Sequence, residues 1–145
     1  IADDILIISM AMLIGYFATR TGAFATLFSS LYDGTIPGWF ALIATPFGMM
    51  LASIFGVHPV ISSTVFLAVF TSGHTDVHPA LLMQAHLIGW GAGTMSSVAS
   101  LSVIMGASLF RVRSRDLVLG VNLFAAFSYA LVGGIALSFI NIMIF

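Results

Sequence analysis

The sequence has very little charge and lacks three residue types altogether. Of its 145 residues only 6% are charged, and lysine, glutamate and cysteine do not occur. A soluble domain carries about 25% charged residues, so this chain lacks the solvated groups that would cover a water-facing surface. The scarcity of basic residues also excludes a nucleic-acid binder, which needs a basic stripe. The absence of cysteine excludes disulfides, thiolate catalysis and cysteine-ligated metals.

Apolar residues dominate what is present. They make up 60% of the chain, and the mean hydropathy is +1.16. This content excludes disorder and indicates an integral membrane protein. In hydrocarbon the backbone must satisfy its own hydrogen bonds, as a helix or a closed barrel. A barrel needs strands that alternate polar and apolar residues. The stretch ALLMQAHLIGW at 80–90 does not alternate, so the sequence predicts an all-α integral membrane fold.

Charges and turn residues divide the chain into four apolar blocks. At roughly 20 residues per span, we expect about four to five membrane segments within a single transmembrane domain, 1–145. The first block either forms one long tilted helix with Arg20 near its end or breaks at Gly22. Because the chain starts at Ile1 and stops within an apolar run, we expect it to be a processed chain, or part of a longer polypeptide or a larger assembly. The four segments are 4–32, 36–71, 79–110 and 117–145.

The arginines give an orientation. Arg111, Arg113 and Arg115 lie between the third and fourth blocks. The positive-inside rule places such a loop in the cytoplasm, and the C-terminus would then be outside. We expect the bacterial inner membrane as the location.

The second block has features of a re-entrant hairpin. Pro46–Phe55 and Val60–Phe70 are ten and eleven residues long, or about 15–17 Å each as helices. Each arm would cross half of a hydrocarbon core of roughly 30 Å. Between them lies a tip of Gly, Val, His and Pro, followed by Ser62, Ser63 and Thr64. The alternative is two kinked full spans, with Ile36–Phe55 crossing once.

The third block is too long for one straight span. Its 32 residues would measure about 48 Å as a regular helix. The stretch from Gly89 to Ser102 is rich in glycine and serine, which are poor helix formers. We therefore expect a broken helix, which presents N–H groups at one helix start and C=O groups at the other helix end. The N–H groups at the helix start would bind an anion, and the C=O groups at the helix end would bind a cation.

Each polar residue of these blocks has a functional and a structural interpretation. The serines and threonines of the third block either line a site for a small polar solute or let helices pack closely, with their hydroxyls bonded to carbonyls one turn back. His58 either carries a proton, because histidine changes charge near neutral pH, or caps the backbone at the Pro59 turn. His86 is expected to make a hydrogen bond between helices, with a proton relay as the alternative.

The sequence offers nothing that an enzyme would use. It contains no Ser/His/Asp arrangement, no paired carboxylates and no phosphate-binding loop, so we expect neither catalysis nor a cofactor. His74, Asp76 and His78 resemble a metal cluster. They lack a fourth ligand, however, and we expect an exposed loop and no metal.

Three stretches resemble the ion transporter superfamily, which includes arsenite, citrate, dicarboxylate, Na+/H+ and TRAP-type transporters. AMLIGYFATRTGAF at 11–24 is similar to its apolar helix that ends in Thr or Ser, Gly and a hydrophobic residue. GVHPVISST at 56–64 resembles its hairpin tips, and 89–102 resembles its unwound helix. The order of elements matches one inverted repeat, the C-terminal one. Ser62-Ser63-Thr64 replaces the Ser-Asn-Thr typical of dicarboxylate and sodium-coupled members, which leaves the substrate and sodium coupling open.

The resemblance implies ion-coupled transport of a small anionic solute, bound between the Gly56–Thr64 tip and the Gly91–Ser100 break. H+ or Na+ would be the coupling ion, with His58 as the proton-linked residue. The lipid bilayer and another copy, another subunit or a missing half of the chain would be the partners. The alternative is a non-transporting helical subunit that scaffolds or anchors a larger complex. The expected substrate-binding residues are Ser62, Ser63, Thr64, Gly91, Gly93, Thr94, Ser96 and Ser97.

Overall fold

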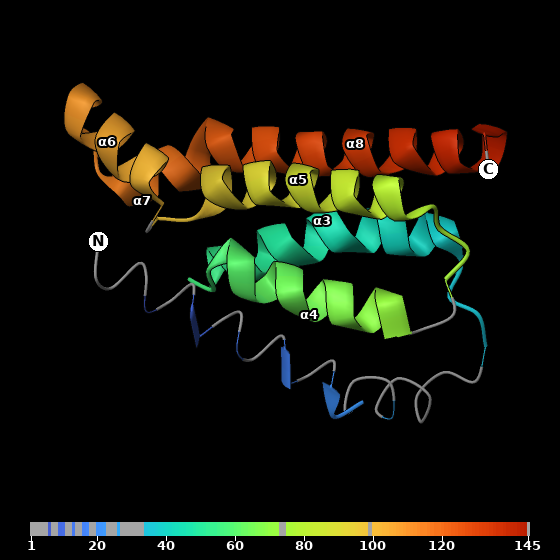
Figure 1. The fold of residues 1–145 in the computed structure, drawn as a ribbon. Coiled ribbons are helices and arrows are strands. Elements are labelled where there is room, and N and C mark those ends of the chain that lie inside the picture. Colours follow the sequence, from blue (N-terminus) through green and yellow to red (C-terminus); the bar gives the residue numbers. More distant parts are fainter. Residues whose placement is uncertain are drawn as a thin grey trace.

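The computed structural model describes residues 6, 9–10, 13, 16–17, 20–22, 26, 34–72, 75–98 and 100–144. As predicted, the fold is helical, and the described part of the chain contains no strand beyond a single bridge between Ile36 and Thr75. Figure 1 shows the arrangement. The elements are α3 (Gly38–Ile54), α4 (Pro59–Ser72), α5 (Pro79–Ser96), α6 (Leu101–Phe110), α7 (Ser114–Leu117), the π-helical turn η1 (Val118–Asn122) and α8 (Leu123–Ile144).

Four helices, α3, α4, α5 and α8, lie side by side with similar axis directions, and α3 packs against the other three (Figure 1). The core of this bundle combines bulky and small side chains. Leu42, Met49 and Met50 from α3 are almost completely buried. Leu42 and Met50 pack against small residues of α5 and α8, which let the helices approach closely. Those small residues are Ala85, Ala92, Ala126 and Ala130, all 0% exposed.

Glycines mark the closest helix contacts. A Cβ atom on Gly89 would lie 3.0 Å from Cα of Pro46, and one on Gly134 would lie 3.0 Å from Cα of Ile43. In both places a helix packs directly against the backbone of α3, which cannot move aside. Some glycines that the sequence analysis assigned to a break in the third block therefore serve helix packing.

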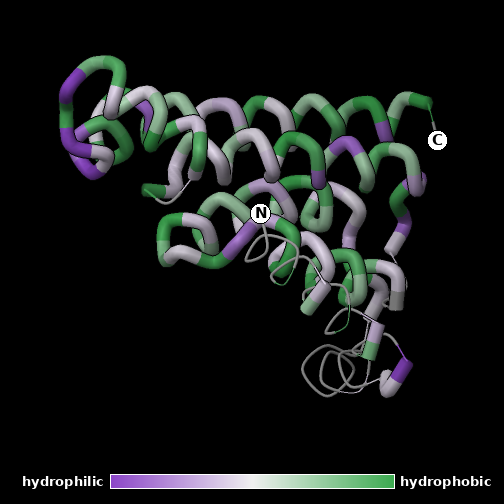
Figure 2. Tube along the Cα trace, turned by 60° about the vertical axis from the view of Figure 1, so that its left-hand side comes forward, coloured by the Kyte–Doolittle hydropathy of each residue, from purple (hydrophilic) through white to green (hydrophobic). Residues whose placement is uncertain are grey.

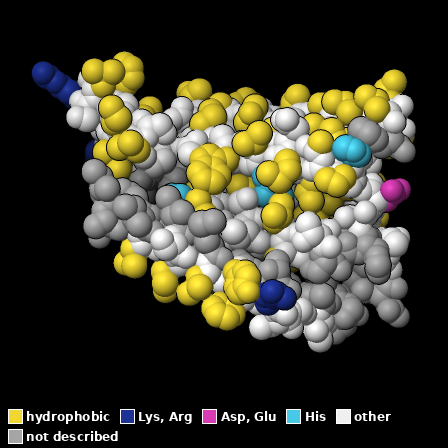
Figure 3. Space-filling view, viewed as in Figure 1, with side chains coloured by type: hydrophobic (Ala, Val, Ile, Leu, Met, Phe, Trp, Pro, Cys, Tyr) yellow, Lys and Arg dark blue, Asp and Glu magenta, His cyan; other side chains and the backbone are white. Residues whose placement is uncertain are grey.

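The two ends of the bundle differ. At one end Asn141 of α8 holds the segment before α5, because its Nδ2 donates to the Asp76 carbonyl (3.0 Å) and its Oδ1 accepts from the His78 N–H (3.1 Å). At the other end lie the turn between α3 and α4, the link between α5 and α6, and the arginines near α7 (Figures 1 and 2). In Figure 3 basic side chains appear at the left edge and at the lower middle of the molecule and an acidic one at the right edge, with hydrophobic side chains between them.

Two stretches are long and apolar enough to cross a membrane, Pro79–Phe110 and Ser114–Ile144, while α3 and α4 are shorter apolar helices. Large hydrophobic side chains face outward, including Leu109 (78% exposed) and Met143 (82% exposed). The last predicted segment, 117–145, contains the η1 turn, which is kinked at Gly120, and the helix α8.

The helix boundaries correct two predictions. The first arm of the hairpin does not start at Pro46, because α3 starts at Gly38 and continues through this proline for 17 residues in all. The break in the third block does not begin near Gly89, because α5 continues to Ser96. In both cases close packing within the bundle stabilises helix where local propensity alone disfavours it.

Most of the first predicted segment, 4–32, lies outside the described residues. Its described residues before Thr21 are helical, and Gly22 interrupts them with a φ of 61°. Glycine adopts this left-handed conformation without steric cost. The backbone therefore agrees with the alternative in which this segment breaks at Gly22.

Candidate functional site

The turn between α3 and α4 is built by a glycine, a histidine and a proline. Gly56 has a φ of 83°, which reverses the chain after α3. Its N–H and that of Val57 bond back to carbonyls of the last turn of α3, at 3.1 and 3.0 Å. Pro59 then begins α4, where its missing N–H costs nothing. His58 caps this helix, because its Nδ1 accepts from the N–H of Val60 at 3.3 Å.

The link between α5 and α6 is built by two serines. Ser97 is extended, with φ −97° and ψ 123°, and ends α5. Ser100 begins α6, because its hydroxyl oxygen accepts from the N–H of Val103 at 3.3 Å. The same hydroxyl donates to the Thr94 carbonyl at 2.6 Å, which ties the start of α6 to the end of α5. The interruption predicted in the third block thus lies at 97–100, at the end of the stretch that we expected to be unwound.

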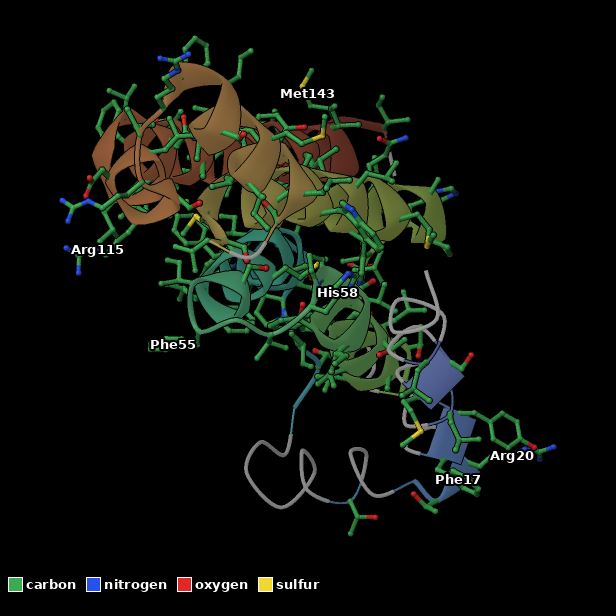
Figure 4. The ribbon with its side chains drawn as sticks, turned by 90° about the vertical axis from the view of Figure 1, so that its left-hand side faces the viewer. Phe17, Arg20, Phe55, His58, Arg115 and Met143 are labelled. Carbon is green, nitrogen blue, oxygen red and sulfur yellow. The ribbon has the colours of Figure 1, made fainter. Side chains whose placement is uncertain are left out.

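These two interruptions border one cavity of about 580 Å³. The His58 ring stands edge-on to the Trp90 ring, with centroids 6.1 Å apart, and so closes one side. Figure 4 shows His58 between the ribbons of α4 and α5, whereas Phe55 of the same turn points away from the bundle. The lining residues are Gly56, Val57, His58 and Pro59 from the turn, Trp90, Gly93, Thr94 and Ser97 from α5 and its end, and Ser100, Leu101 and Ile104 from α6 and its start.

Helix ends dominate the electrostatics of the cavity. No lining residue carries a formal charge apart from the titratable His58. The starts of α4 and α6 reach the cavity at Pro59 and Leu101. A helix start carries a partial positive charge that favours an anion. At α4 the N–H groups of Val60 and Ile61 are already bonded to His58. The ends of α3 and α5 also reach it, at Gly56 and Ser97, with C=O groups that favour a cation.

Four of the nine residues predicted for substrate or proton binding line this cavity. They are His58, Gly93, Thr94 and Ser97. Gly93 is needed for the contact of α5 with α3, because a Cβ atom there would lie 2.6 Å from Oγ of Ser53. Thr94 donates its hydroxyl to the Gly91 carbonyl at 2.8 Å, so its oxygen is left to accept a hydrogen bond.

Three of the other five have hydroxyl groups bonded to carbonyls of the bundle. Ser62 is buried and donates to the Pro59 carbonyl at 3.2 Å, and Thr64 donates to the Ile61 carbonyl at 2.8 Å. Ser96 is also buried and donates to the Gly93 carbonyl at 3.2 Å. Ser96 thus follows the structural interpretation given for the third block, and it also lies 3.4 Å from the Met50 carbonyl of α3. Ser62 and Thr64 bond back along their own helix in the same way.

The other two are Ser63 and Gly91, which also lie outside the cavity lining. A Cβ atom on Gly91 would lie 3.1 Å from Cε1 of Tyr129, so this glycine lets α8 pack against α5. The carbonyl of Ser63 faces the ring of His86.

Trp90, Leu101 and Ile104 were not predicted to line the site, whereas Ser100 stood at the end of the predicted break. Helical spacing contained a signal for Trp90. Trp90, Gly93, Thr94 and Ser97 stand at positions i, i+3, i+4 and i+7, which share one face of a helix. Ser100, Leu101 and Ile104 carried no such signal, because their placement depends on the direction in which α6 leaves the link.

Neither the Arg113–Asp116 pair nor His78 lines this cavity. Arg113 forms an exposed ion pair with Asp116, with Nε 2.7 Å from Oδ2, and this hydrogen bond raises the pKa of Arg113. His78 caps α5, because its Nδ1 accepts from the N–H of Ala80 at 3.3 Å. His74, the third member of the metal-like motif, lies outside the described residues, and the part of the chain that is described holds no group of three metal-ligating side chains.

No protein-family model, curated protein or solved structure matches this chain. The resemblance to the ion transporter superfamily therefore rests on the three sequence stretches alone.

Proposed function

We propose that this chain is an integral membrane protein and one half of a secondary transporter for a small anionic solute, similar in plan to a C-terminal repeat of the ion transporter superfamily. The observation that carries the proposal is that two backbone interruptions, distant in sequence, border one cavity. Each interruption brings one helix start and one helix end to it. Discontinuous helices of transporters use these ends to hold substrate and coupling ions.

The size and chemistry of the cavity support a small solute. Ligand sites commonly enclose about 300–1,000 Å³, and this cavity has about 580 Å³. The partial positive charge of the helix starts at Pro59 and Leu101 would attract the anion. The carbonyl groups at the ends of α3 and α5 would accept Na+ or a protonated group.

α3 is longer than the predicted first arm and nearly covers the Ile36–Phe55 span of the alternative, but both helices are still short enough for a hairpin. α3 and α4 have 17 and 14 residues, which makes them about 26 and 21 Å long. Both are shorter than a hydrocarbon core of roughly 30 Å, so their turn would end within the membrane. Since the cavity lies near the arginine-rich end of the bundle, the site would lie closer to that side than to the midplane. With the Arg111–Arg115 loop in the cytoplasm of a bacterial inner membrane, the C-terminus would be outside.

Uptake by proteoliposomes that contain the full chain tests the proposal. The probes are radiolabelled acetate, succinate, citrate and phosphate. Ile104→Trp fills the cavity from its α6 side, and Ile135→Trp is the matched control on the outer face of α8, with 39% of the side chain exposed against 47% for Ile104. We expect uptake of at least one probe by the unaltered chain and the control, and its loss in Ile104→Trp. Equal uptake by both variants would exclude this cavity as the site.

The alternative function is a membrane scaffold without transport, which the outward-facing hydrophobic side chains of α6 and α8 would also suit. Cysteine accessibility separates the two functions, because the chain has no native cysteine. Val57→Cys and Ile104→Cys should react with a membrane-impermeant thiol reagent if the cavity holds water, whereas Ala130→Cys, at a position 0% exposed, should not. Unreactive cysteines at both cavity positions, with no uptake of any probe, would favour the scaffold.

A further inference from the structure

His86 lies in the interior of the bundle with carbonyl oxygens on both sides of its ring. It is only 5% exposed and stands on α5, one turn before Trp90. Its Nδ1 is 2.8 Å from the carbonyl oxygen of Leu82 in the same helix. Its Nε2 is 3.3 Å from the carbonyl oxygen of Ser63 in α4. The ring therefore bridges two helices whose contacting residues are 23 positions apart.

A neutral imidazole cannot make both of these hydrogen bonds. It has one N–H, while a carbonyl oxygen can only accept. The shorter contact, to Leu82, fixes the proton on Nδ1 in the neutral ring. The lone pair of Nε2 then faces the lone pairs of the Ser63 carbonyl, without a hydrogen bond between them. Only the doubly protonated imidazolium donates to both carbonyls and so joins α5 to α4.

The helices packed around His86 provide no counter-charge. α3 and α4 contain no ionisable side chain, and α5 contains no other. The only ionisable side chain of α8 is that of Tyr129, which lies against Gly91. The described part of the N-terminal segment has exposed Tyr16 and Arg20, and Arg20 points away from the bundle in Figure 4. The two carbonyl groups are thus the groups that would stabilise a proton on this ring.

We infer that His86 is a proton-binding site that fastens α4 to α5 when it is protonated and releases that contact when it is neutral. The hydrogen bond from His86 to the Ser63 carbonyl is present at pH values low enough to protonate the ring. It is lost as the pH rises and the ring becomes neutral. Ser63 lies about one turn after Pro59, which lines the cavity. Protonation of His86 would therefore hold the part of α4 that borders the candidate site against α5. That this proton is the coupling ion rests on the proposed function. The assignment moves proton linkage from His58, whose Nδ1 already caps α4, to His86.

Two measurements on the full chain in lipid nanodiscs test the inference without any solute. Ring-¹⁵N histidine NMR across pH, assigned with His86→Gln and His58→Gln, counts the protonated nitrogens of each ring. Amide hydrogen exchange, corrected for intrinsic rates, measures the protection of α4. We expect the His86 ring to gain its second proton on acidification and α4 to exchange roughly tenfold more slowly, as one charge-assisted hydrogen bond would produce. In His86→Gln the slowing of α4 exchange on acidification should vanish, whereas it should remain in His58→Gln, which removes only the cap at Val60.

A His86 ring that keeps one protonated nitrogen at every pH at which the chain is folded would overturn the inference. So would α4 exchange that does not change while the ring titrates. Should His86→Gln lose its helical circular dichroism, His58→Gln and His78→Gln, with a His74→Gln variant, assign the remaining resonance by elimination. Failure of uptake in proteoliposomes would count against the proposed function only, since neither measurement involves transport.

Discussion

The packed middle of the bundle and its interrupted end use the same residue types for opposite purposes. Gly134 meets the backbone of α3, so there the absence of a side chain permits close packing. Gly56 has nothing within 4 Å of where its Cβ would be, and its φ of 83° reverses the chain. Likewise Ser62 donates back within its own helix, while Ser100 starts a new one. Residue type alone therefore does not decide between packing and interruption.

The largest effect is expected where packing is tightest. In Gly134→Ala the new methyl group would lie 3.0 Å from Cα of Ile43, and backbone cannot yield as a side chain does. We expect a loss of about 1–3 kcal/mol in the free energy of unfolding, measured by thermal melting in detergent. Gly106→Ala is the matched control, because its methyl group would meet only Cδ2 of Leu117 at 3.4 Å. Equal melting temperatures for Gly134→Ala and Gly106→Ala would show that the packing at Gly134 is no tighter than at Gly106.

At the end of the bundle held by Asn141, hydrogen bonds should matter more than packing. Asn141→Leu removes the bonds to the Asp76 carbonyl and the His78 N–H. We expect a loss of about 1–2 kcal/mol, again by thermal melting, with faster amide exchange at the start of α5. Ile142→Leu, at a position 74% exposed, should melt like the unaltered chain. Normal exchange at the start of α5 in Asn141→Leu would show that this end is held by other contacts.

At the interrupted end the effect should be smaller and local. Ser100→Ala removes the cap of α6 and the hydrogen bond to the Thr94 carbonyl. Loss of a cap of this kind costs about 1 kcal/mol, and we expect faster amide exchange in the first turn of α6 with little change elsewhere. Ser100→Thr keeps a capping hydroxyl and should behave like the unaltered chain. Faster exchange throughout α3 and α5 would mean that the two regions unfold together.

The smallest effect is expected in the arginine-rich loop. The Arg113–Asp116 pair is exposed, and exposed ion pairs contribute little because water screens them. Arg113→Ala should therefore leave the melting temperature unchanged at both low and high salt. A clear drop that disappears at high salt would give this loop a structural role that its exposure does not suggest.

Several elements could be predicted because their cause is local. The turn at 56–59 follows from Gly56 and Pro59, whose backbone preferences end one helix and start the next. Helical structure follows from the long apolar blocks. By contrast, α3 runs through Pro46 and α5 runs through Gly89, Gly91 and Gly93, where local preferences predicted arms and breaks. Packing at Pro46, Tyr129 and Ser53 outweighed those preferences, and no local pattern records such contacts.

The sequence by itself determined that this chain is apolar, helical and interrupted. Nearly 140 of its residues are uncharged, and in an apolar environment the backbone N–H and C=O groups must bond to one another, as they do in helices. Only the tertiary structure decided where the interruptions meet and which polar groups remain available there. The physical reason is that a hydroxyl or an imidazole is satisfied by whichever carbonyl lies within about 3 Å. That carbonyl belongs to the same helix for Ser62, and to both the same helix and a second one for Ser96 and His86.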